Sequence, residues 1–271
     1  MFLGNVQVML QNTDSNSTQS ADTLSQIDNS VDQDTWVDRF VVAFGNTIAW
    51  LFPALMIAIC TQVVLRKMGN NLAWLDDAQW WIYGLALTVG FVYAITTQSH
   101  VRVDILFMNF RPSKKARTEI VGLGWMLLPF LVLMTDILFN YSWASFQVRE
   151  GSDSPNGLHR LYLLKMALPW IFIIAMAATL SILIRHLRVI ATVRLWTVLL
   201  AIFPAAWFVL ERLSHTVLWW YVRLTNPDIR SSHINKEPLL EPTMWIGLAI
   251  LLSVITISFI SHHRSAKRLS T

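Results

Sequence analysis

Residues 74–104 read WLDDAQWWIYGLALTVGFVYAITTQSHVRVD. The stretch begins with aromatic and acidic residues, runs free of charge from Ala78 to Ser99, and ends on His100, Arg102 and Asp104. About 20 uncharged residues, at ~1.5 Å rise each, span the ~30 Å hydrocarbon core of a bilayer. The stretch therefore predicts a transmembrane helix whose two ends carry different charged groups.

The composition predicts an integral membrane protein rather than a soluble domain. Hydrophobic residues make up 54% of the chain and charged residues only 14%, and most of the 13 Trp lie near the ends of apolar runs, as in an interfacial aromatic belt. The basic residues cluster in the flanking loops, so we expect no nucleic-acid partner. The single cysteine, Cys60, excludes an internal disulfide, and its apolar setting predicts a buried side chain.

The pattern of apolar runs predicts an all-α, polytopic fold with about six transmembrane helices and a short interfacial helix. The expected spans are 40–65, 80–97, 120–143, 166–184, 195–212 and 244–260, and the expected interfacial piece is 72–80. Residues 1–39 hold six Asp and no basic residue before Arg39, which predicts a disordered acidic tail. We divide the rest into a four-helix core, 40–190, and a C-terminal part, 191–271, with two additional helices and a basic tail.

The loop charges predict the orientation. Connections 97–117 and 185–194 and the tail 261–271 together hold eleven basic residues and one acid. The other three connections, 66–79, 147–165 and 222–242, hold eight basic residues and seven acids. The positive-inside rule assigns the first group to the cytoplasm, so both termini are expected there.

The sequence holds no signature of a catalytic or cofactor site. Of the seven His, only His215 falls within a predicted span, whereas a haem anchor needs axial His on facing helices. There is no P-loop, zinc-protease or nucleophile-elbow motif. We therefore expect no enzyme activity and no cofactor or metal in this chain. Asp136, near the far end of the third span, is either functional or a packing residue.

Small residues at helical spacing are candidates for close helix packing. These are Gly84 and Gly90 in the second span and Ala177 and Ser181 in the fourth.

Four motifs in fixed order resemble the small membrane subunit of tripartite ATP-independent periplasmic (TRAP) transporters. They are NNLAWLDDAQWWIYG (70–84), QSHVRVDIL (98–106), EGSDSPNGLHR (150–160) and LPW (168–170). The first places Trp74, Asp76 and Asp77 at the entry to the second span, and the last places Pro169 at the start of the fourth. The resemblance covers roughly residues 38–190 and is greatest to the mannitol and chloroaromatic-compound type.

The resemblance implies a fixed scaffold in the bacterial inner membrane. In this family a periplasmic solute-binding protein captures an organic acid, and a large multi-spanning membrane subunit carries it inward by an elevator motion coupled to sodium. The small subunit supports the large one, contacts lipid and helps to dock the binding protein. Sodium ions are accordingly expected in the partner subunit, not in this chain.

For the matching residues two interpretations stay open. His100, Arg102 and Asp104 either structure a cytoplasmic loop or its partner contact, or are ordinary head-group-zone charges. Arg149, Glu150 and Asp153 either meet the binding protein or are solvated loop charges. Asp76 and Asp77 also suit a helix N-terminus.

The last two predicted helices go beyond the family's usual four spans. We expect them to add contact surface against the large subunit or a second protomer. The competing class is a structural anchor or assembly subunit of a respiratory or envelope complex, which would not depend on a large transporter subunit.

Overall fold

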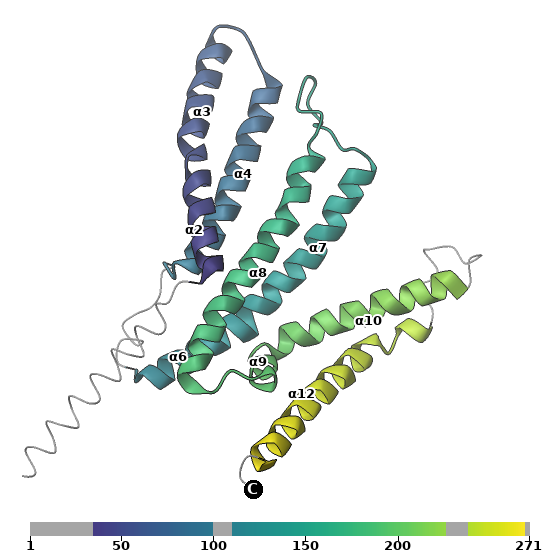
Figure 1. Ribbon diagram of the computed structural model, residues 1–271. Coiled ribbons are helices and arrows are strands. Elements are labelled where there is room, and N and C mark those ends of the chain that lie inside the picture. The colour runs from purple at the N-terminus through teal and green to yellow at the C-terminus, as the bar shows by residue number, and fades with distance from the viewer. Residues whose placement is uncertain (1–34, 100–109, 226–237, 269–271) are drawn as a thin grey trace, which may run out of the picture.

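Figure 1 shows the computed structural model, which describes residues 35–99, 110–225 and 238–268. Regular structure in these ranges is entirely helical, which confirms the predicted all-α polytopic class. The elements are α2 (Trp36–Ala49), α3 (Leu51–Lys67), α4 (Ala73–Thr96), α6 (Pro112–Val121), the π-helical segment η1 (Gly122–Leu127), α7 (Leu128–Gln147), α8 (Tyr162–Ile190), α9 (Leu195–Ala201), α10 (Phe203–Thr225), the 3-10 turn η2 (Pro238–Leu240) and α12 (Thr243–Arg268).

The first predicted span is two helices joined end to end, α2 and α3, which together form a candidate span of 32 residues. Pro53 lies three residues after the break at Trp50 and has no amide to donate to the Ala49 carbonyl. The Trp50 amide donates to the Thr47 carbonyl, three residues earlier, at 3.3 Å. The helix begins at Trp36, so the last four residues of the predicted tail are helical. Cys60 is exposed on α3, contrary to the prediction that it is buried.

Residues 72–80 do not form a separate interfacial helix. From Ala73 onward they are the first turns of α4, which continues unbroken to Thr96. No Gly or Pro interrupts the chain before Gly84, and Asp76 lies in the first turn, where a carboxylate is favourable. The second span is therefore longer than predicted.

The third span runs through α6, η1 and α7, with a change of helix type in the middle. Pro129 at the start of α7 removes one amide from the ladder, and the preceding turns widen into the π-helical segment η1. In the fourth span, α8 begins at Tyr162, so Pro169 lies inside the helix and not in its first turn as predicted. A transmembrane helix tolerates such a proline because neighbouring groups satisfy the freed carbonyl.

We call helices α2 to α8 the body, and α8 is its central helix. Helix α8 contacts α2, α4, α6 and α7, whereas α3 packs mainly on α4. The buried core joins Val92 and Ile95 of α4, Leu131 of α7, and Ile182 and Leu183 of α8. The core thus lies between α4, α7 and α8.

In the C-terminal part, the predicted fifth span, 195–212, is divided between two helices. Helices α9 and α10 bend by 94° at Ile202, where Pro204 cannot donate to the Leu200 carbonyl. Helices α10 and α12 pack on each other, and this hairpin projects sideways from the body (Figure 1). At Gly247 an added Cβ would lie 2.7 Å from the Glu211 amide nitrogen, so only glycine permits this approach.

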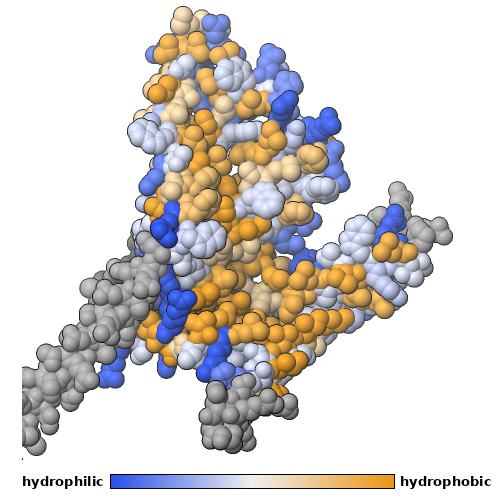
Figure 2. Space-filling model, viewed as in Figure 1, coloured by the Kyte–Doolittle hydropathy of each residue, from blue (hydrophilic) through white to orange (hydrophobic). Residues whose placement is uncertain are grey.

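Polar contacts define the two ends of the molecule. At one end Arg185 meets Asp38 at 3.4 Å, and Arg194 meets His262 at 3.1 Å. At the other end Asp77 accepts a bond from the Leu158 amide. Between these ends apolar side chains dominate the visible surface (Figure 2). In the described ranges five helices are long and apolar enough to cross a membrane, or six if the bent α9–α10 pair is one span.

Candidate functional site

The entry motif and the 150–160 loop, far apart in sequence, meet at one end of the body. The Asp77 carboxylate accepts a bond from the Leu158 amide at 2.9 Å, and the Ser152 amide donates to the Leu158 carbonyl, also at 2.9 Å. A Cβ added to Gly157 would lie 2.5 Å from Asp77 Oδ2 and would displace the carboxylate that holds the loop. Asp77 therefore fixes the loop to α4.

Glu150 also holds this loop in place. Its carboxylate accepts bonds from Lys165 and from the Ser145 hydroxyl, both at 2.6 Å. The hydrogen bond from Lys165, followed by that from Ser145, lowers the pKa of Glu150 below its ordinary value of 4.5. The Lys165 ammonium also lies 4.4 Å from the centre of the Tyr141 ring. Glu150 is thus engaged within the chain.

The remaining charges of the loop point outward. Arg149, in the left-handed region with φ +48°, and Asp153 are both exposed. Their exposure leaves them accessible to a soluble protein.

Asp76 and Trp74 lie at the connection between α3 and α4. Arg66 approaches Asp76 at 3.1 Å, and both side chains are substantially exposed. An exposed pair of this kind contributes ~1 kcal/mol or less. Trp74 is exposed as well. Asp76 therefore joins the ends of two helices, while Trp74 presents its ring outward.

The opposite end holds polar contacts that the sequence patterns did not single out. His100, Arg102 and Asp104 lie outside the described residues. Among the described residues of this end, the Gln98 amide lies 3.5 Å from His186 Nε2, and buried Arg185 pairs with buried Asp38. The sequence signal for Asp38 was available: it follows Thr35 by three residues, as in a capping box, and accepts the Thr35 amide at 2.9 Å.

The predicted packing residues have different surroundings. The Ser181 hydroxyl lies 2.6 Å from that of Thr35, which joins α8 to the start of α2. Nothing lies within 4 Å of a Cβ added to Gly84 or Gly90, and Ala177 is exposed. Within the described chain, close backbone approaches occur instead at Gly124 and Gly247. Close helix packing at Gly84, Gly90 and Ala177 therefore stays a prediction.

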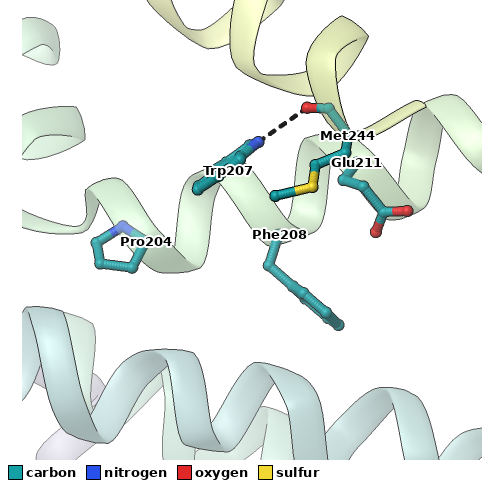
Figure 3. A pocket seen from close by; sticks show the side chains of 5 residues that line it. All are labelled: Pro204, Trp207, Phe208, Glu211 and Met244. Atoms are coloured by element: carbon teal, nitrogen blue, oxygen red, sulfur yellow. Dashed lines mark hydrogen bonds between the residues drawn. The ribbon is translucent and has the colours of Figure 1, made fainter. Parts of the chain in front are cut away.

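Asp136 joins the body to the hairpin. Arg212 of α10 meets its carboxylate at 3.0 Å and also lies 3.8 Å from Glu211. Beside this cluster a cavity of about 300 Å³ is lined by Pro204, Trp207, Phe208, Glu211 and Met244 (Figure 3). The Trp207 indole donates to the Met244 carbonyl at 3.0 Å, which leaves the Glu211 carboxylate as the polar group of this cavity.

A family model described as the DctQ component of tripartite ATP-independent periplasmic transporters matches residues 55–189. The match covers most of α3, then α4 to α8, and stops one residue before the end of α8. Comparisons with curated proteins and with solved structures gave no significant match. The C-terminal helices α9, α10 and α12 lie beyond the matched residues. Residues 55–189 of this chain therefore match the DctQ family, which is the small membrane component of TRAP transporters, a transport component and not an enzyme.

Proposed function

We propose that this chain is the scaffold subunit of a sodium-coupled, binding-protein-dependent transporter that imports an organic acid across the bacterial inner membrane. It supports a large membrane subunit through α3 and α4 and presents the 149–161 loop to a periplasmic binding protein. The observation that carries the proposal is the exposed apolar side of α3 and α4.

Helices α3 and α4 expose apolar side chains along their length. Trp50, which immediately precedes α3, and Ile57 and Val64 of α3 are each more than half exposed. Gly90 lines a shallow groove of about 360 Å³ between α2, α3 and α4, together with Gly45 and Ala49. Small residues at an exposed helix surface let the backbone of another transmembrane helix approach closely. A surface that faces only lipid does not require small residues. This side therefore suits the helices of a large membrane partner.

The loop end suits a soluble partner. Asp77 and Glu150 fix the loop to α4 and α8, so Arg149 and Asp153 are held at defined positions before any partner binds. Preorganised charges lose little freedom on association. Rim charges of this kind mainly set the association rate of a complementary surface.

The first experiment is purification of the tagged chain in mild detergent from its native membranes, with mass spectrometry of the co-eluting proteins. We expect a large multi-spanning membrane protein in stoichiometric amount, and Gly90→Leu should reduce its recovery. Gly122→Leu is the matched control, because Gly122 is also open but lies on the α6–α7 side of the body. Recovery of the chain alone, or with redox subunits, would overturn the scaffold role.

Transport and docking are tested in proteoliposomes that contain both membrane subunits and the binding protein. Uptake of an organic acid should require a sodium gradient and this chain. Arg149→Glu combined with Asp153→Lys should raise the binding-protein concentration needed for half-maximal uptake without lowering the maximal rate. Uptake that needs ATP, or that is unchanged without this chain, contradicts the proposal.

The C-terminal helices have a separate test. We expect deletion of residues 195–271 to weaken co-purification of the large subunit, because α10 and α12 add apolar surface beyond the matched region. Unchanged assembly and uptake would show that these helices have another role.

A further inference from the structure

A groove separates the body from the α10–α12 hairpin. Two adjoining cavities of about 350 and 370 Å³ lie along α10, and both touch Val132 of α7 and Val209 of α10. The cavity nearer α9 is lined by aliphatic side chains alone, including Leu199 and Leu251. The other adds the polar groups of Asp136 and Arg212. The groove is thus apolar along its length and charged toward one end, which is the polarity of a phospholipid.

Among the described residues, the charged end of the groove carries an excess of one carboxylate. The Arg212 guanidinium lies 3.0 Å from Asp136 and 3.8 Å from Glu211, so two acids share one base. The exposed fractions of Asp136 and Glu211 are only 29% and 22%. The Thr243 hydroxyl donates to the Glu211 carboxylate at 3.5 Å, and the Ser214 hydroxyl donates to the Glu211 backbone carbonyl at 2.8 Å. His215 follows one turn later on α10. Two partly buried carboxylates that share one guanidinium keep a net negative charge, so this end favours a ligand with a cationic group.

The surroundings of Glu211 suit an ammonium group. Its cavity is bordered by the aromatic side chains of Trp207 and Phe208 and by Met244 (Figure 3). Aromatic faces attract an ammonium group, and the carboxylate supplies the counter-charge. Phe208 lines both this cavity and the charged part of the groove, so the two spaces adjoin.

We infer that this groove binds a phospholipid with an ammonium headgroup, such as phosphatidylethanolamine. An acyl chain lies between α7 and α10, the phosphate meets Arg212, and the ammonium meets Glu211. The order of charges, Arg212 followed by Glu211, is complementary to the phosphate and ammonium of such a lipid. A transmembrane helix of ~10 Å diameter and ~30 Å length occupies roughly 2,000 Å³, several times the volume of the two cavities together. The space therefore fits a lipid chain and not a helix.

The test is native mass spectrometry of the full chain in detergent, first with its retained native lipids and then after delipidation and addition of equal amounts of phosphatidylethanolamine, phosphatidylcholine and phosphatidylglycerol. We expect the ethanolamine lipid to be retained in preference to the glycerol lipid. Glu211→Gln should reduce this preference roughly tenfold, the effect of one charge-assisted hydrogen bond. Val209→Trp, which fills the groove, should reduce retention of all three lipids.

Asp76→Asn is the matched control, because it also removes one ion-paired carboxylate but lies at the α3–α4 connection. Its lipid preference should equal that of the unmodified chain. Equal retention of the three lipids, preference for the glycerol lipid, or no effect of Glu211→Gln would overturn the inference. Crosslinking from Thr216→Cys to another protein in native membranes, with lipid retention unaffected by Val209→Trp, would assign the groove to a protein partner instead.

Discussion

At the scale of single residues, burial separates one ion pair from the others. The Asp38–Arg185 pair is almost fully enclosed, with side chains 3% and 8% exposed, whereas the Arg66–Asp76 pair is 40% exposed or more. Asp38 also accepts the Thr35 amide, so it both starts α2 and ties it to α8. Since a buried charge loses its hydration, the loss of either partner leaves the other uncompensated.

We predict that Asp38→Asn lowers the stability of the detergent-solubilised chain by about 3 kcal/mol, measured as the shift in its thermal unfolding transition. The double variant Asp38→Asn with Arg185→Gln should be less destabilised than the sum of the two single variants, because neither charge is then left alone. Asp76→Asn, which breaks an exposed pair, should change stability by ~1 kcal/mol or less. Equal effects of Asp38→Asn and Asp76→Asn would contradict this account.

Glu150 gives the loop a pH dependence. Its pKa is lowered below 4.5, mainly by the hydrogen bond from Lys165, so the folded loop favours the ionised form. The stabilisation is fully present above the ordinary pKa and is lost as the pH falls through the lower, folded value. We predict that hydrogen exchange of the Ser152 amide, which donates to the Leu158 carbonyl, accelerates only below about pH 4.5, once corrected for intrinsic exchange. In the Glu150→Gln variant this amide should exchange faster at neutral pH, and the acid transition should be lost. An exchange profile that is unchanged in this variant would contradict the role of Glu150.

At the scale of elements, three prolines coincide with irregular helix geometry and a fourth does not. Pro53, Pro129 and Pro204 follow the break at Trp50, the π-helical segment and the 94° bend, respectively. Pro169 lies inside α8, which continues as one helix. A proline frees one carbonyl in every case, but packing around it decides whether the axis bends.

The junction between the body and α9 depends on Gly124. A Cβ there would lie 2.1 Å from the Ala201 carbonyl oxygen, which is backbone and cannot move aside cheaply. We predict that Gly124→Ala destabilises the chain by ~1–3 kcal/mol in thermal unfolding. Gly122→Ala, two residues earlier with nothing within 4 Å, should be neutral or slightly stabilising because alanine favours helix. Equal stability of the two variants would show that α9 does not pack tightly here.

At the scale of the whole molecule, three segments lie at the same end: the start of α2, the end of α8 and the C-terminal part of α12 (Figure 1). The basic connections predict that this end is cytoplasmic. With the bent α9–α10 pair counted as one span, six spans return the chain to the same side.

We test this orientation with single cysteines in a Cys60→Ser chain, labelled in cells by a membrane-impermeant maleimide. Ser154→Cys in the loop end should react from outside, and Thr192→Cys should react only after lysis. Thr225→Cys, at the end of α10, should react from outside if the bent pair crosses the membrane. Reaction of Thr192→Cys in intact cells would invert the topology, and protection of Thr225→Cys would leave five spans.

The apolar runs were enough to predict the helical membrane class and the approximate spans. The motifs between and within these runs were enough to indicate the family. Hydropathy and motif spacing are both local properties of the chain. Asp77 and the 150–160 loop could each be identified as parts of a motif, but nothing local indicated that they contact each other.

Only the tertiary structure decided which polar groups are buried together. Asp38 lies within the predicted tail and Arg185 within a basic cluster, and their pairing depends on the packing of α2 against α8. Likewise, the join of Asp136 to Arg212 depends on a bend at Ile202 that turns α10 away from a straight span. Contacts between distant segments follow from the packing of whole helices, which hydropathy alone does not specify.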